Sequence, residues 1–231
     1  MIDYIGNELE LFQHAKNWKG YFSSSIKKYI QGDTLEVGAG FGVNTNYLVN
    51  NSVNSWTFIE PDAQLAGRIM EYTSELKIPK KVLVGTLQKL EGEMYDTIIY
   101  IDVLEHIEAS KAEIELIKRH LKPEGHLIIL VPAYQYLFSE FDKSIGHFRR
   151  YNKQLLRSEV NSVLKEKKLF YLDSCGVMAS VANKLFLKKS AINLGQVKFW
   201  DRVLVNFSKI SDQIVFRSFG KSLIGVYQNK K

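Results

Sequence analysis

The six-residue segment GHFRRY, which ends at Tyr151, gathers side chains that could act on a substrate. Histidine exchanges a proton readily near neutral pH, so His147 could be a general base that Asp142 orients. The guanidinium groups of Arg149 and Arg150 are forked donors that suit a carboxylate or a phosphate. Tyr151 could line the same pocket. The segment predicts a site for an anionic acceptor, although a solvated turn with Arg149 paired to nearby acids would also explain it.

A glycine-rich turn, LEVGAGFG, ends the first strand-like stretch of the chain. Its glycines, Gly38, Gly40 and Gly42, permit a sharp turn and the close approach of a ligand to the backbone. Glu60 ends the next strand-like stretch, 22 residues after Gly38. A carboxylate there can accept hydrogen bonds from both hydroxyls of a ribose. The turn and the acid together predict a cofactor that contains a nucleoside.

The residues around this turn distinguish between cofactors. A dinucleotide site usually has the spacing G-x-G-x-x-G, and here the third glycine comes one residue early. Glu36 precedes the turn, and its charge would repel a pyrophosphate but attract the sulfonium and ammonium groups of S-adenosyl-L-methionine. The sequence therefore predicts S-adenosyl-L-methionine rather than NAD.

Three potential metal ligands lie together in the segment DVLEHIE. Asp102, Glu105 and His106 could converge on a divalent ion. The arrangement resembles the ligand set of small-RNA 2′-O-methyltransferases, and that resemblance implies a further histidine ligand, for which His147 is the candidate. The same residue types also cap and pack the start of a helix where no metal binds. We favour the second interpretation, so no metal ligand is predicted, and the metal site stays open as the alternative.

Four segments, TLEVGAGFG, FIEPD, YDTIIYIDVLEHI and LKPEGHLIILVP, resemble in their order the motifs of class I S-adenosylmethionine-dependent methyltransferases. The resemblance covers residues 30–135. It implies a Rossmann-like α/β fold with a seven-stranded sheet whose last strand is antiparallel. It also implies a cofactor site that runs from the methionine part through the ribose to the adenine, made by Glu36, Gly38, Ala39, Gly40, Phe41, Gly42, Glu60, Pro61, Thr86, Leu87 and Asp102.

The segment VPAYQYLFSEFDKSIGHFRRY resembles a bacterial methyltransferase subgroup with the pattern V-P-A, D and G-H-x-R-R-Y. Its members are associated with surface-polysaccharide or polyprenol-linked sugar chemistry. The resemblance implies methylation of a small or lipid-linked, sugar-type acceptor. A histidine base suits methylation of oxygen rather than nitrogen, so we expect O-methylation. Two alternatives are a metal-dependent RNA 2′-O-methyltransferase and a non-catalytic, cofactor-binding partner subunit.

Strand-like runs alternate with amphipathic, helix-length segments, which predicts a parallel sheet flanked by helices. We expect one domain over 1–231. It would contain an N-terminal helical region over 1–31, a cofactor-binding core over 32–176, a helical insertion over 177–215 and the last strand over 216–231. Within the core, KQLLRSEVNSVLKEK predicts a helix and KLFYLDSCGV a strand.

The chain of 231 residues has a net charge of +6 and a single cysteine. One cysteine excludes an intramolecular disulfide and a thiolate-rich zinc site. The first residues lack the basic start and apolar run of a signal peptide, so we expect a cytoplasmic protein.

Positive charge is concentrated near the C-terminus, where residues 176–231 carry 10 Lys and Arg against 2 Asp and Glu. Within 184–217 these basic residues alternate with aromatic ones. The pattern predicts an amphipathic helical cap and, as a second interpretation, peripheral contact with an anionic membrane. Nucleic-acid binding is not expected because no compact nucleic-acid motif is present, and no obligate protein partner is predicted.

Overall fold

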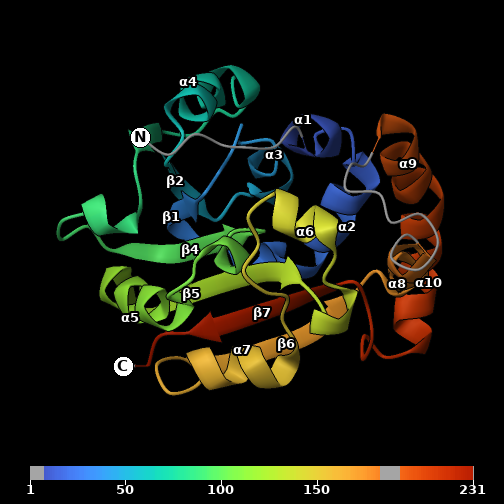
Figure 1. Ribbon diagram of the computed structural model, residues 1–231. Coiled ribbons are helices and arrows are strands. Elements are labelled where there is room, and N and C mark those ends of the chain that lie inside the picture. Colours follow the sequence, from blue (N-terminus) through green and yellow to red (C-terminus); the bar gives the residue numbers. More distant parts are fainter. Residues whose placement is uncertain (1–7, 183–192, 231) are drawn as a thin grey trace.

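The computed structural model describes residues 8–182 and 193–230, and its centre is one seven-stranded sheet (Figure 1). The strand order is β3-β2-β1-β4-β5-β7-β6, and β7 runs antiparallel to both of its neighbours. The order and the antiparallel strand confirm the predicted fold. The strands are β1 (Gly32–Val37), β2 (Val53–Glu60), β3 (Lys80–Val84), β4 (Tyr95–Ile101), β5 (Leu121–Pro132), β6 (Lys165–Leu172) and β7 (Ser222–Gln228).

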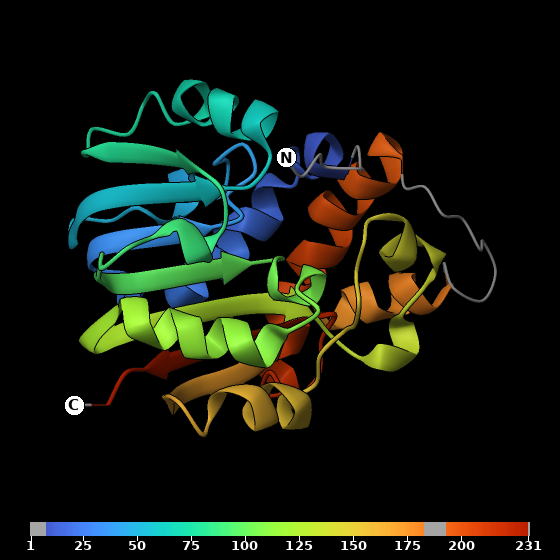
Figure 2. The same cartoon turned by 60° about the vertical axis from the view of Figure 1, so that its left-hand side comes forward.

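Helices cover both faces of the sheet (Figure 2). One face packs against α5 (Ser110–His120) and α7 (Lys153–Val160). The other face carries the remaining layer of helices, with α6 (Glu140–Ser144) beyond the end of β5. That layer consists of α1 (Glu8–Phe12), α2 (Lys16–Ile26), α3 (Thr45–Leu48), α4 (Ala63–Tyr72), α8 (Ser174–Ala182), α9 (Leu194–Phe199) and α10 (Val205–Ile214).

The apolar run of β4 shows why the sheet needs both layers. Side chains alternate between the faces of a strand, so Ile98 and Tyr100 enter the core under α5, while Ile99 and Ile101 enter the core under α2. All four are buried. A parallel strand with two buried faces therefore has continuous rather than alternating hydrophobicity.

The connection between α7 and α8 differs from the sequence prediction. The expected helix over 153–167 ends at Val160, and Lys165 already begins β6. The expected strand over 168–177 ends at Leu172, because Asp173 adopts a left-handed φ of 66°. The Asp173 carboxylate then accepts a hydrogen bond from the Gly176 backbone N–H at 3.0 Å and caps the first turn of α8.

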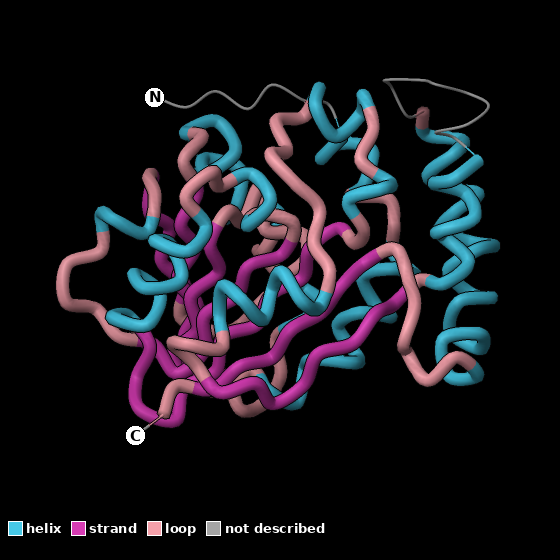
Figure 3. Tube along the Cα trace, turned by 60° about the horizontal axis from the view of Figure 1, so that its bottom comes forward, coloured by secondary structure: helices cyan, strands magenta, loops and turns pink. Residues whose placement is uncertain are grey.

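The helical insertion lies between β6 and β7, as expected. A π-helical turn over Trp200–Leu204 joins α9 to α10 (Figure 3). Asp212 ties α10 to the sheet, because its carboxylate accepts hydrogen bonds from Tyr21 Oη and from the backbone of Asp173 and Ser174 at 2.7–2.8 Å. Residues 184–192 of the predicted basic segment lie outside the described residues. Among the described helices, none combines the length and hydrophobicity needed to cross a bilayer.

Candidate active site

A cavity of about 380 Å³ opens at the carboxyl edge of the parallel strands. This edge is where doubly wound sheets bind ligands, because the loops after neighbouring strands converge there. The predicted residues that line the cavity are Gly38, Ala39, Gly40, Phe41, Glu60, Pro61, Asp102, His147 and Arg150. The predicted residues outside this lining are Glu36, Gly42, Thr86, Leu87, Arg149 and Tyr151.

The glycine turn after β1 opens the backbone toward the cavity. Gly38 and Gly40 have left-handed φ values of 63° and 55°, a conformation that side chains disfavour. A Cβ on Gly38 would also lie 2.6 Å from Val103. Gly42 is left-handed as well, with a φ of 74°, and a Cβ there would press on Thr73 at 3.0 Å.

Glu60 joins this turn to the end of β2. Its two carboxylate oxygens accept hydrogen bonds from the backbone N–H groups of Gly40, at 2.8 Å, and Asp62, at 3.0 Å. Burial raises the pKa of Glu60, and these two hydrogen bonds partly oppose the shift. These bonds hold the carboxylate in place at the cavity wall. Each oxygen keeps a second lone pair, so the carboxylate can still accept hydrogen bonds from a ligand.

Three residues of the expected cofactor site, Glu36, Thr86 and Leu87, do not line the cavity. The buried Glu36 carboxylate accepts hydrogen bonds from Thr45 Oγ1 at 2.6 Å and Trp56 Nε1 at 3.0 Å. It therefore holds α3 against β2, and burial raises its pKa to about 7. Leu87 is fully buried in the core, and Thr86 Oγ1 donates to Gln88 at 3.2 Å.

Asp102 follows β4 and lies at the meeting point of the charged side chains in the cavity. Its backbone has a left-handed φ of 53°, which is uncommon for a residue other than glycine. Asp102 is exposed at the cavity. Desolvation by the surrounding protein raises its pKa, while the charges of His147, Lys221 and Lys19 lower it. Asp102 is thus an acid that interacts electrostatically with three basic side chains.

The segment after α6 brings His147 and Arg150 to one carboxylate, that of Asp142. Arg150 makes a two-point ion pair with Asp142 at 2.7 and 2.9 Å, and His147 Nδ1 lies 3.0 Å from Oδ1. Burial opposes ionisation of Asp142, but the hydrogen bonds from His147 and Arg150 outweigh it and lower its pKa. Arg150 Nη1 is buried and has no hydrogen-bond partner among the described residues.

Arg149 and Tyr151 point away from the cavity, which corrects their predicted role in acceptor binding. The Arg149 guanidinium donates to the carbonyl oxygens of Ile107 and Glu108 and to Ser110 Oγ at 2.7–3.1 Å. It therefore fastens the loop before α5. Tyr151 is fully buried in the core, and burial raises its pKa to about 12.

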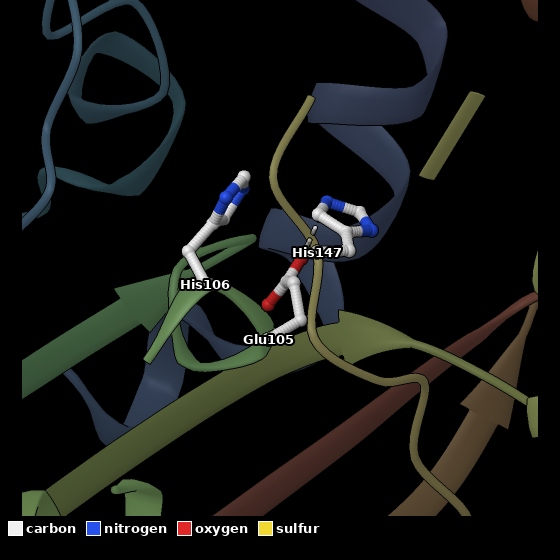
Figure 4. A group of neighbouring side chains, drawn as sticks. All are labelled: Glu105, His106 and His147. Atoms are coloured by element: carbon white, nitrogen blue, oxygen red, sulfur yellow. Dashed lines mark ion pairs between the residues drawn. The ribbon is translucent and has the colours of Figure 1, made fainter. Parts of the chain in front are cut away.

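Glu105, His106 and His147 form the one group of possible metal ligands found among the described residues, and Asp102 does not belong to it (Figure 4). Their ligand atoms lie within 4.8 Å of one another. Glu105 is fully buried, and neither of its carboxylate oxygens has a hydrogen-bond partner in the described part of the chain. Its oxygen Oε1 lies 3.8 Å from His147 Nε2. Burial lowers the pKa of His106 to about 4, so this ring is neutral.

Sequence reasoning missed two lysines in the cavity wall. Lys19 of α2 donates to the Phe12 carbonyl oxygen, and burial lowers its pKa to about 8. Lys221 lies just before β7, 4.6 Å from the centroid of the Trp200 ring, and burial lowers its pKa as well. A signal existed for Lys221, because an antiparallel last strand begins at the edge where the parallel strands end. Lys19 lies inside an amphipathic helix, and nothing in the sequence around it indicates a ligand-binding residue.

Comparisons with known proteins agree with this fold. A family model described as a methyltransferase domain matches residues 11–169. The N-methyltransferase NodS from Bradyrhizobium japonicum WM9, solved with S-adenosyl-L-homocysteine, is 14% identical, with a TM-score of 0.60 over 95% of this chain and 88% of that one. An S-adenosylmethionine-dependent methyltransferase from Clostridium acetobutylicum is 10% identical, with a TM-score of 0.59 over 94% and 92%. At these identities the two structures show the fold alone.

A curated relative matches a shorter segment. The hybrid PKS-NRPS synthetase traA from Penicillium crustosum is 30% identical over 113 residues, which is 45% of this chain and only 3% of the synthetase. The family model, in contrast, covers more than half of the chain. The chain therefore belongs to the family of class I S-adenosylmethionine-dependent methyltransferase domains.

Proposed function

We propose that the protein transfers a methyl group from S-adenosylmethionine to a hydroxyl oxygen of a small or lipid-linked, sugar-type acceptor that carries an anionic group. The observation that carries the proposal is the Asp142–His147 pair, which opens onto the same cavity as the glycine turn and Glu60. A base therefore faces the space next to the expected cofactor site. A closed, non-catalytic pocket is less consistent with a cavity that reaches His147.

The residues on one side of the cavity fit the cofactor. The left-handed backbone at Gly38 and Gly40 leaves room for the methionine part, and the remaining lone pairs of Glu60 suit the ribose hydroxyls. The acid at Asp102 suits an ammonium group. When bound, S-adenosylmethionine supplies an electrophilic methyl group, so the protein needs mainly to hold the acceptor in line with it.

His147 is suited to take the acceptor proton. Asp142 is held as a carboxylate by Arg150, so the His147 Nδ1–H donates to it and Nε2 keeps its lone pair. The ring can then accept the hydroxyl proton as the oxygen becomes a nucleophile, and the imidazolium that results is stabilised by Asp142.

Two basic side chains in the cavity lining support an anionic acceptor. Arg150 Nη1 is buried without a hydrogen-bond partner among the described residues, and Lys221 lines the same cavity. A buried donor without a partner is costly, and a carboxylate or phosphate of the acceptor would satisfy it. Arg150 and Lys221 therefore replace the pair of adjacent arginines in the proposed anion site.

A metal-dependent reaction, such as 2′-O-methylation of RNA, is the second candidate, and the buried carboxylate of Glu105 favours it. A divalent ion held by Glu105, His106 and His147 would satisfy that carboxylate and bind the acceptor oxygen directly. His147 Nε2 would then be a ligand rather than a base. The two candidates thus differ in their response to chelation.

Both candidates are tested by measuring release of S-adenosylhomocysteine from the purified protein. The acceptors are hydroxyl sugars and polyprenyl-linked sugars, with and without a phosphate or carboxylate, together with amines and short RNAs. Amines belong in the panel because NodS is an N-methyltransferase. We expect turnover with anionic hydroxyl acceptors that EDTA leaves unchanged. Turnover with amines alone would contradict the proposal, and RNA methylation that EDTA abolishes would establish the second candidate.

A further inference from the structure

The helical insertion has an inner face that lines the cavity and an outer face that is exposed and apolar. On the inner face, Trp200 borders the cavity, and its ring centroid lies 5.7 Å from that of Trp18 in α2. On the outer face of α10, Phe207, Ile210 and Ile214 are exposed by 62%, 64% and 70%. Positions three and four apart share one side of a helix, so these three side chains form a stripe.

Two further exposed aromatic side chains extend this apolar surface at the ends of the helical unit. Phe199 ends α9 and Phe216 follows α10, with exposures of 58% and 90%. Large apolar side chains that gather on one surface mark an interaction site more often than scattered ones. In Figure 1, α8, α9 and α10 stand together at one edge of the molecule, away from α4 and α5.

The charges of this unit are arranged asymmetrically. Its acids over 193–220 are Asp201 and Asp212, and both are buried. Asp201 accepts hydrogen bonds from the backbone and side chain of Asn17 and from the Trp18 backbone, at 2.8–3.2 Å. Asp212 accepts hydrogen bonds from Tyr21 Oη and from the backbone of Asp173, which follows β6. The basic side chains of Lys198 and Arg202 are exposed.

An apolar surface with exposed positive charge and with its acids turned inward is complementary to anionic lipid headgroups. A protein partner would need its own apolar and acidic surface, whereas an anionic bilayer supplies both properties at once. We propose that the outer face of α9 and α10, made by Phe199, Phe207, Ile210, Ile214, Lys198 and Arg202, docks peripherally on a membrane that contains anionic lipid. The cavity lies behind the same helices, so docking would bring it close to a lipid-linked acceptor.

The test is co-sedimentation of the full chain with vesicles of phosphatidylcholine, with or without phosphatidylglycerol. The variant Phe207→Ser/Ile210→Ser/Ile214→Ser removes the stripe, and Met70→Ser/Met94→Ser is the control, since these methionines are 50% and 44% exposed outside the insertion. We expect the wild type and the control to bind anionic vesicles, more weakly as salt is added. The affinity of the triple variant for these vesicles should be lower by about tenfold or more.

Unchanged S-adenosylhomocysteine affinity and unchanged thermal unfolding would show that the triple variant is folded. The proposal is overturned if the wild type ignores anionic vesicles, or if the triple variant binds them as well as the wild type does. It is also overturned if light scattering finds a wild-type dimer that the triple substitution separates, because the face would then be an interface between copies. Vesicle binding needs no methyl transfer, so it is tested independently of the proposed reaction.

Discussion

Asp142 and His147 are joined by a contact of 3.0 Å between the carboxylate Oδ1 and the ring Nδ1. The two-point ion pair with Arg150 helps to keep Asp142 ionised, so the histidine must be the donor in this contact. Asp142 thereby orients the ring and leaves Nε2, which lies 3.8 Å from Glu105 Oε1, as its basic atom. A six-residue stretch, 142–147, thus contains both the proposed base and the group that positions it.

The first prediction concerns this base. His147→Ala should lower turnover about a hundredfold or more, because no general base then accepts the proton of the acceptor hydroxyl. The affinity for S-adenosylhomocysteine, measured by calorimetry, should stay nearly unchanged. His14→Ala, at an exposed position, is the matched control. A loss of cofactor affinity with retained turnover would place His147 in the cofactor site instead.

A second prediction concerns the ribose site. The Glu60 carboxylate accepts backbone hydrogen bonds at both oxygens, and a glutamine can accept at only one. Glu60→Gln should therefore disturb the turn at Gly40 and weaken S-adenosylhomocysteine binding about tenfold or more, which is about 1.4 kcal/mol. Glu91→Gln, at an exposed position, is the control. Equal affinities for the two variants would remove Glu60 from the cofactor site.

A third prediction is that substitutions at Arg149 and Arg150 should have different effects. Arg149→Ala removes three hydrogen bonds to the loop before α5, and should lower the free energy of unfolding by about 1–3 kcal/mol. The acceptor KM should not change. Arg150→Lys keeps a charge beside Asp142 but removes the buried Nη1, so it should raise the acceptor KM.

Denaturant unfolding and steady-state kinetics separate these two effects, with the exposed Arg119→Ala as the control. A raised acceptor KM in Arg149→Ala would restore Arg149 to the acceptor site. An unchanged KM in Arg150→Lys would refute the proposed anion site.

The fourth prediction concerns pH and stability. Burial raises the pKa of Glu36 from an ordinary value of 4.5 to about 7, so the folded state binds this proton more tightly than the unfolded state. The contribution of Glu36 to stability is therefore greatest below pH 4.5 and falls as pH rises toward 7. The shift corresponds to a loss on the order of 3 kcal/mol.

Glu36→Gln should remove this part of the pH dependence, since an amide oxygen can still accept from Thr45 and Trp56. Urea unfolding of the wild type and the variant between pH 4.5 and 7.5 measures the difference. Parallel stability curves over this range would show that Glu36 is ionised in the folded protein without penalty.

Much of the fold followed from local patterns in the sequence. The apolar runs of β1, β4 and β5 predicted buried parallel strands, and the glycine turn with Glu60 predicted where the loops after β1 and β2 meet. The register of these strands depends on side-chain periodicity and strand ends, both of which are local. The end of β6 was harder to predict, because it depends on the left-handed backbone of Asp173 and its contacts with α10.

The sequence by itself determined the class of fold, the family and the loops that surround the cavity, because glycine conformation and strand periodicity are properties of short segments. Only the tertiary structure decided which side chains face that cavity. Glu36 and Arg149 turn to partners inside the protein, while Lys19 and Lys221 meet Asp102 from opposite ends of the chain. The orientation of each side chain depends on which polar groups lie nearby after the helices pack on the sheet. A buried polar group needs a hydrogen-bond partner, and tertiary packing determines which partner is close enough.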